Sequence, residues 1–173
     1  MASSDIKKKK RLVYISYAVL LMLIYLFEYS ANISSPLGKG SVSLLVPAAI
    51  ISGIMFKEWA GAFYGLAAGA AIDVFSQDSF IFSTIALFVI CCLVGLLISR
   101  LFLNNTFSAI ILICGATFCY YLTKWLFCIL FGKNIEAWSY LTNVTLPTAF
   151  FTSLAAIPLY LVLRTIYRKI VKK

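Results

Sequence analysis

The chain consists of long apolar runs separated by short polar interruptions. The apolar runs cover residues 12–29, 42–56, 59–75, 80–99, 107–131 and 146–163. A helix needs about 20 apolar residues to cross a bilayer, and most of these runs approach or exceed that length. The pattern therefore predicts an all-α integral membrane protein with about six transmembrane helices.

The polar interruptions indicate how the helices are joined. Connections are expected at residues 32–41, 76–79, 101–106 and 132–145. The second and third runs are separated only by Lys57 and Glu58. The second run is short and contains Pro47, so we expect its helix to be kinked or frayed.

Composition excludes an ordinary soluble domain. Apolar residue types make up 62% of the 173 residues and charged types only 12%, whereas about 25% of a typical soluble domain is charged. The mean hydropathy is +0.98. We expect a basic tail at residues 1–11, a single six-helix membrane domain at 12–163, and a second basic tail at 164–173.

Basic residues are distributed unevenly between the two sides of this predicted domain. Six helices place both termini on one side, and that side receives 12 of the 15 Lys and Arg residues, against 2 on the other. Cytoplasmic loops carry such an excess, so both termini are predicted to be cytoplasmic. The net charge of +9 is then explained by orientation and by attraction to anionic membrane lipid, without a nucleic-acid partner.

The residues needed for catalysis or metal binding are scarce. The chain has no histidine, which excludes catalytic triads and zinc sites that depend on imidazole. The five cysteines lie inside apolar runs, where we interpret them as reduced packing residues. We find no phosphate-binding loop and no paired carboxylates on a shared helix face. The sequence thus predicts a protein that is not an enzyme and has no cofactor or metal.

The third run has a distinctive spacing of small residues. Gly61, Gly65 and Gly69 recur every four residues, and Asp73 continues the same series. Residues four apart form one ridge along a helix, and glycines on such a ridge let another backbone approach closely in lipid. The ridge is therefore a helix-packing face within the chain, a face for a partner subunit, or both.

Two charged residues of the apolar runs need an explanation. Asp73 lies near the predicted outer end of its helix, and Lys124 lies within the fifth run. Because an unpaired charge inside a membrane costs about 2.5–3.5 kcal/mol, Lys124 is a possible intramembrane charge partner of Asp73. The alternatives are a carboxylate exposed to interfacial water and a lysine that extends toward the membrane surface.

The stretch from Trp59 to Ser76, with its spaced glycines and Asp73, resembles the signature of the rod shape-determining protein MreD family. The apolar run 80–99 and the following Arg100 extend the resemblance to about residue 102. The resemblance implies a non-enzymatic subunit of the bacterial inner membrane. Such proteins work with bitopic MreC, with a RodA-type glycosyltransferase and a penicillin-binding transpeptidase, and with the MreB cytoskeleton.

MreD-like proteins are also similar in fold to the S-components of energy-coupling-factor vitamin transporters. A substrate-binding S-component is therefore the alternative function. Such a binder needs several polar groups that converge at the outer side. The polar residues of the predicted outer side are scattered along the sequence, which favours a scaffold. They are Glu28, Asn32, Lys39, Asp78, Glu136 and Asn143.

Overall fold

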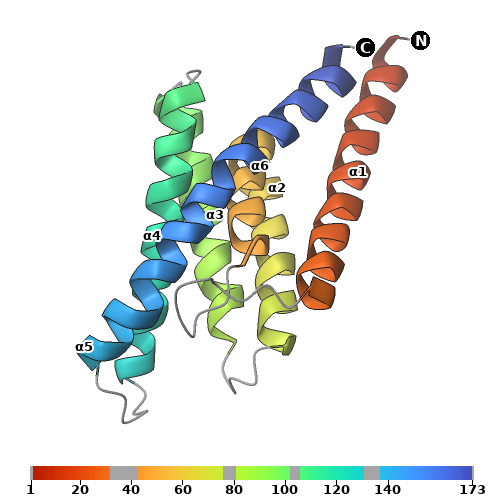
Figure 1. Cartoon of the computed structure of the whole chain (residues 1–173). Coiled ribbons are helices and arrows are strands. Elements are labelled where there is room, and N and C mark those ends of the chain that lie inside the picture. Colours follow the sequence, from red (N-terminus) through yellow and green to blue (C-terminus); the bar gives the residue numbers. More distant parts are fainter. Residues whose placement is uncertain (1, 32–42, 76–80, 102–105, 131–136, 173) are drawn as a thin grey trace.

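The computed structural model describes residues 2–31, 43–75, 81–101, 106–130 and 137–172, and these form helices without a strand. The predicted all-α fold is confirmed for this part of the chain (Figure 1). The elements are α1 (Ala2–Ala31), α2 (Leu45–Phe75), α3 (Phe82–Leu101), α4 (Thr106–Leu130), α5 (Ala137–Tyr140), η1 (Leu141–Thr145) and α6 (Leu146–Lys172). The predicted loops at 32–41 and 76–79 and most of the connection at 101–106 lie outside the described residues.

Helix α2 contains both the second and the third predicted runs, and it is not straight. The Ser52 hydroxyl donates a hydrogen bond to the Gly61 carbonyl oxygen over 3.3 Å, although nine residues of a straight helix span roughly 13 Å. The chain direction therefore reverses between two arms, Leu45–Phe56 and Trp59–Val74. The reversal falls at the two charged residues that separate the predicted runs.

The described residues contain six apolar helical segments, three long and three short. Three are long and apolar enough to cross a membrane, namely Phe82–Ser99, Thr106–Leu130 and Trp138–Thr165. Three are shorter, namely α1 residues Tyr14–Glu28 and the two arms of α2. Helix α1 begins and α6 ends at the same end of the bundle (Figure 1).

Helix extends further than the sequence analysis predicts. Helix α1 includes the basic residues 7–11, and α6 continues to Lys172, so both predicted tails are largely helical. Lys and Arg are good helix formers, and neither Gly nor Pro interrupts these segments. The helix before the sixth run also begins earlier than expected, at Ala137.

A π-helical turn, η1, joins α5 to α6 within this early start. The Leu146 N–H donates to the carbonyl oxygen of Leu141, five residues earlier. Pro147 follows directly. A proline has no N–H, and its ring collides with the carbonyl four residues earlier. The wider π turn provides space at this point, which explains why the chain remains helical through a proline.

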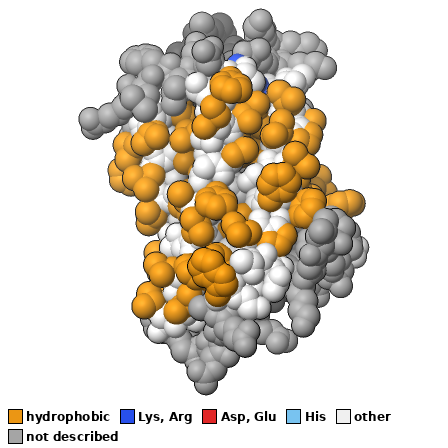
Figure 2. Space-filling model, turned by 60° about the vertical axis from the view of Figure 1, so that its left-hand side comes forward, with side chains coloured by type: hydrophobic (Ala, Val, Ile, Leu, Met, Phe, Trp, Pro, Cys, Tyr) orange, Lys and Arg blue, Asp and Glu red, His pale blue; other side chains and the backbone are white. Residues whose placement is uncertain are grey.

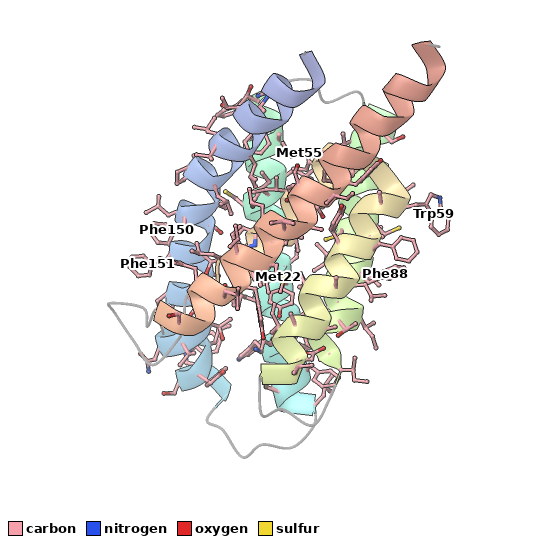
Figure 3. All side chains as sticks on the ribbon, turned by 90° about the vertical axis from the view of Figure 1, so that its right-hand side faces the viewer. Met22, Met55, Trp59, Phe88, Phe150 and Phe151 are labelled. Atoms are coloured by element: carbon pink, nitrogen blue, oxygen red, sulfur yellow. The ribbon has the colours of Figure 1, made fainter. Side chains whose placement is uncertain are left out.

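The outer surface of the bundle is apolar, as expected where lipid is the solvent. Figure 2 shows apolar side chains over the described part of one face along its height. In Figure 3, Trp59 and Phe88 project from one side of the bundle and Phe150 and Phe151 from the other. Trp59 is 75% exposed and Phe150 is 67% exposed. Several small or hydroxylated side chains are instead buried between the helices, such as Ala48, Ser52 and Thr152.

Candidate functional site

The spaced glycines of the second α2 arm lie against α3. A Cβ atom at Gly65 would lie 2.8 Å from the Leu87 carbonyl oxygen, and one at Gly69 would lie 2.5 Å from the Thr84 Cα. Both distances are shorter than real Cβ contacts, so no larger residue fits. The second arm and α3 are therefore packed backbone to backbone, which is the close approach that glycine permits in a membrane.

Gly61 faces the other arm of α2. A Cβ atom there would lie 2.4 Å from the Gly53 Cα, and a Cβ atom at Gly53 would lie 2.8 Å from the Cys91 carbonyl oxygen. The thiol of Cys91 donates a hydrogen bond over 3.3 Å to the carbonyl oxygen of Ala49 on the first arm. Both arms and α3 thus meet around Cys91. The space beside Gly61, Gly65 and Gly69 is filled by the chain itself and leaves no room there for a partner helix.

Asp73 binds the first turn of α3 with both carboxylate oxygens. Oδ1 accepts a hydrogen bond from the Ser83 N–H over 3.0 Å. Oδ2 accepts from the Thr84 N–H over 2.7 Å and from the Thr84 hydroxyl over 2.6 Å. The carboxylate therefore closes the connection between the second α2 arm and α3.

This contact pairs N–H groups that would otherwise have no acceptor at the start of α3. The first N–H groups of a helix have no partner inside it, and the positive end of the helix dipole lies there. The residue before α3 is Ile81, which has no side-chain acceptor with which to cap the helix. Asp73, supplied by the preceding helix, satisfies the N–H groups of Ser83 and Thr84 instead.

Glu28 provides the same kind of cap for α2, a role that the sequence analysis missed. Its Oε2 accepts a hydrogen bond over 2.9 Å from the N–H of Leu45, the first residue of α2. The two residues are 17 positions apart, with residues 32–42 outside the described part of the chain between them. Each of the first two helices thus ends in a carboxylate that caps the start of the next helix.

Helix α4 contains a pair of buried tyrosines. Tyr120 and Tyr121 are buried, at 1% and 9% exposure, with ring centroids 5.3 Å apart in an edge-on arrangement. Both phenol rings therefore lie between helices of the bundle, and no local sequence pattern indicates which residues they meet.

The Tyr121 hydroxyl also reaches α6. It lies 3.3 Å from the Thr152 hydroxyl, and Thr152 is fully buried. The two carboxylate caps and this pair of hydroxyls each join segments that are remote in the sequence.

Lys124 lies one turn after the tyrosine pair of α4. It follows Tyr120 by four residues and Tyr121 by three, and residues at these spacings share a helix face. Its side chain is half-buried, and the pairing of Lys124 with Asp73 stays a prediction.

A second interhelical contact lies toward the end of the bundle where the termini are. The Arg164 guanidinium donates to the hydroxyl of Thr106, the first residue of α4. The same guanidinium lies 5.8 Å from the centre of the Tyr160 ring. This contact joins the last helix to the start of α4.

These polar groups hold neighbouring helices together. Among the described residues, no three His, Cys, Asp or Glu side chains gather as a metal ion would need. All five cysteines are free. The described arrangement supplies carboxylate, hydroxyl and phenol groups that join helices.

Comparison with known protein families identifies a match over most of the chain. The family model described as rod shape-determining protein MreD matches residues 8–170, nearly the whole chain. No curated protein and no solved structure matches. The predicted likeness in fold to S-components of vitamin transporters therefore stays a prediction. The matched range contains the glycine face, both capping carboxylates and the tyrosine pair.

Proposed function

The chain belongs to the rod shape-determining MreD family, and we propose that it fulfils that role as a non-enzymatic membrane scaffold of the cell-elongation complex. The family match over residues 8–170 is the observation that carries this proposal. The packing is consistent with this proposal, because Gly61, Gly65 and Gly69 contact other helices of the same chain. What remains for partners is the apolar outer surface of the helices.

The proposed partners are a bitopic MreC-like protein and, through it, the wall synthases. These are a RodA-type glycosyltransferase and a penicillin-binding transpeptidase. Most of the described chain belongs to the apolar helical segments, so a partner would have to supply the periplasmic domain. Because the glycine face is filled, a partner helix would pack on outward residues such as Phe63 or Leu93, which are 65% and 52% exposed.

The proposed location is the bacterial inner membrane, with both termini in the cytoplasm. Two observations support this orientation. The helix ends that carry the termini lie at the same end of the bundle (Figure 1). The basic residues are concentrated, 12 against 2, in the segments assigned to that side, as the positive-inside rule requires.

Depletion of the protein in a rod-shaped host tests the role, and affinity purification in mild detergent tests the partners. We expect depleted cells to become round, and the purified protein to retain the MreC-like partner. Cells that stay rod-shaped after complete depletion would overturn the proposed role. Co-purification with an energy-coupling module, together with nanomolar vitamin binding, would instead support the S-component alternative.

A further inference from the structure

The side of the bundle formed by α1 and the second α2 arm is short for a surface that faces a membrane. The two helices lie side by side, since the Tyr64 hydroxyl donates a hydrogen bond over 2.7 Å to the carbonyl oxygen of Tyr14. Their apolar stretches, Tyr14–Glu28 and Trp59–Val74, both fall in the range of 10–17 residues. A helix needs about 20 apolar residues to cross a typical bilayer, and neither stretch reaches that length.

Charged residues bound both stretches in the sequence. The second arm runs from Glu58 to Asp73 without a charge between them, and α1 runs from Arg11 to Glu28 in the same way. At 1.5 Å per residue these distances are about 23 Å and about 26 Å along the helix axes. The hydrocarbon core of a typical bilayer is about 30 Å thick. Because a tilted helix spans less than its own length, the two lengths are upper limits of what this side covers.

The carboxylates at one end of these stretches are held in place by the fold. Helices α1 and α2 both end at the end of the bundle opposite the termini (Figure 1). Glu28 accepts a hydrogen bond over 2.9 Å from the Leu45 N–H, and Asp73 accepts hydrogen bonds from Ser83 and Thr84. A free lysine side chain can extend toward a more distant membrane surface, but a carboxylate bound to a neighbouring backbone cannot. The polar boundary at this end is therefore fixed.

The side chains between these boundaries include large apolar residues that the bundle leaves uncovered. Met22 and Phe27 of α1 are 64% and 61% exposed, and Phe63 of the second arm is 65% exposed. In Figure 3, α1, which carries Met22, lies beside the arm that carries Trp59. Exposed apolar side chains of a membrane protein are solvated by lipid. A bilayer of ordinary thickness would therefore surround the charged ends of these two helices with hydrocarbon, where charges are costly.

The side formed by α4 and α6 has longer apolar segments. Thr106–Leu130 has 25 residues and Trp138–Thr165 has 28. A helix that exceeds the thickness of the bilayer can tilt, and α6 crosses the bundle obliquely (Figure 1). The long side thus accommodates an ordinary bilayer by tilting, whereas the short side cannot lengthen. The mismatch with the bilayer is confined to α1 and the second arm.

We propose that the side formed by α1 and the second α2 arm, where no partner helix covers it, selects lipids with short acyl chains and thins the bilayer beside it. The lipid on this side is then shorter than the lipid beside α6. Mismatch of this kind sorts membrane proteins among bilayers of different thickness, so it directs the protein toward thinner regions of its membrane. The inference concerns lipid only and does not depend on the proposed role in cell shape.

Fluorescence quenching by brominated lipid tests the two sides of the bundle separately. The chain has three tryptophans, Trp59, Trp125 and Trp138, and replacing all three by Phe gives a background without tryptophan. In that background, Phe63→Trp places a reporter on the short side and Phe150→Trp places a matched reporter on α6. The two positions are 65% and 67% exposed, and Phe150 projects from the side opposite Trp59 (Figure 3).

Each full-length reporter protein is reconstituted in brominated dioleoyl-phosphatidylcholine mixed with a second, unbrominated phosphatidylcholine. The recovery of fluorescence measures how well the second lipid displaces the quencher. At Phe63→Trp we expect dipalmitoleoyl-phosphatidylcholine to displace it better than the longer dierucoyl lipid does, and at Phe150→Trp we expect no such preference. An absent preference for the shorter lipid at Phe63→Trp, or the same preference at both reporters, would overturn the proposal.

The unmodified chain provides a second measurement that needs no substitution. Its melting temperature is determined in vesicles of dipalmitoleoyl-, dioleoyl- or dierucoyl-phosphatidylcholine, which share one headgroup and differ in chain length. We expect the highest melting temperature in the dipalmitoleoyl lipid and a lower value with each longer lipid, because longer chains bring hydrocarbon to the fixed charges of Glu28 and Asp73. A maximum in either longer lipid, or a melting temperature that does not depend on chain length, would contradict the proposal.

Discussion

The Thr84 N–H and hydroxyl both donate to Oδ2 of Asp73, over 2.7 and 2.6 Å. Because Asp73 lies in the last turn of α2 and Thr84 in the first turn of α3, the pair fixes how the second α2 arm and α3 meet. Gly69 packs against the same Thr84 backbone. The spaced glycines let the second α2 arm pack closely against α3, and Asp73 connects the two helices at one end.

Replacing Asp73 by Ala should reduce the free energy of unfolding by about 1–3 kcal/mol, because the first turn of α3 loses its acceptor. Thermal unfolding in detergent measures the change. Val74→Ala is the control, since Val74 is 76% exposed and should leave the melting temperature nearly unchanged. Equal shifts in the two variants would show that the cap contributes nothing specific.

A double-mutant cycle between Asp73→Asn and Thr84→Val should give a coupling energy of roughly 0.5–3 kcal/mol, the range for residues in contact. The same cycle with Lys124→Met in place of Thr84→Val tests the charge pair expected from the sequence. If Asp73 and Lys124 interact, the double variant will lose less stability than the two single variants combined. Additive shifts would leave two independent charges.

The glycine face should not accept side chains at its contact positions. Gly65→Leu and Gly69→Leu would place side chains into the α3 backbone, so we expect loss of folded protein, measured as the monodisperse fraction in detergent. Gly115→Ala is the control, because a Cβ atom at Gly115 meets nothing within 4 Å. Normal yields of both leucine variants would mean that these helices are not in close contact.

Glu28→Ala should destabilise the start of α2 by about 1 kcal/mol, a typical value for a lost helix cap. The change should appear as faster amide hydrogen exchange at Leu45, the residue whose N–H the carboxylate binds. Ser30→Ala, on the exposed side of the same helix, is a suitable control. Unchanged exchange at Leu45 in Glu28→Ala would rule out the cap.

Much of the helical framework could be predicted from the sequence, because lipid requires long apolar helices. The apolar runs of the sequence correspond to the six apolar segments of the described residues. Lys57 and Glu58 lie where the chain reverses inside α2. The spacing of Gly61, Gly65 and Gly69 also indicated where backbones approach closely, since that signal is local.

The polar contacts between helices could not be predicted in the same way. Glu28 and Leu45 are 17 residues apart, and Tyr121 and Thr152 are 31 apart, so no periodic pattern connects them. Glu28 has the appearance of an ordinary carboxylate at a helix end until the start of α2 is placed beside it. The π turn before Pro147 could not be predicted either, because the sequence analysis expects a polar connection at residues 132–145 and not a helix.

The most direct test of the proposed role is the aspect ratio of cells in a rod-shaped host depleted of its own copy. Expression of the wild-type chain, or of Val74→Ala, should restore rods after depletion. Asp73→Ala should restore them only partly, because the packed pair of α2 and α3 is weakened. Depleted cells that remain rod-shaped without any copy, while growing at the normal rate, would contradict the role in cell shape.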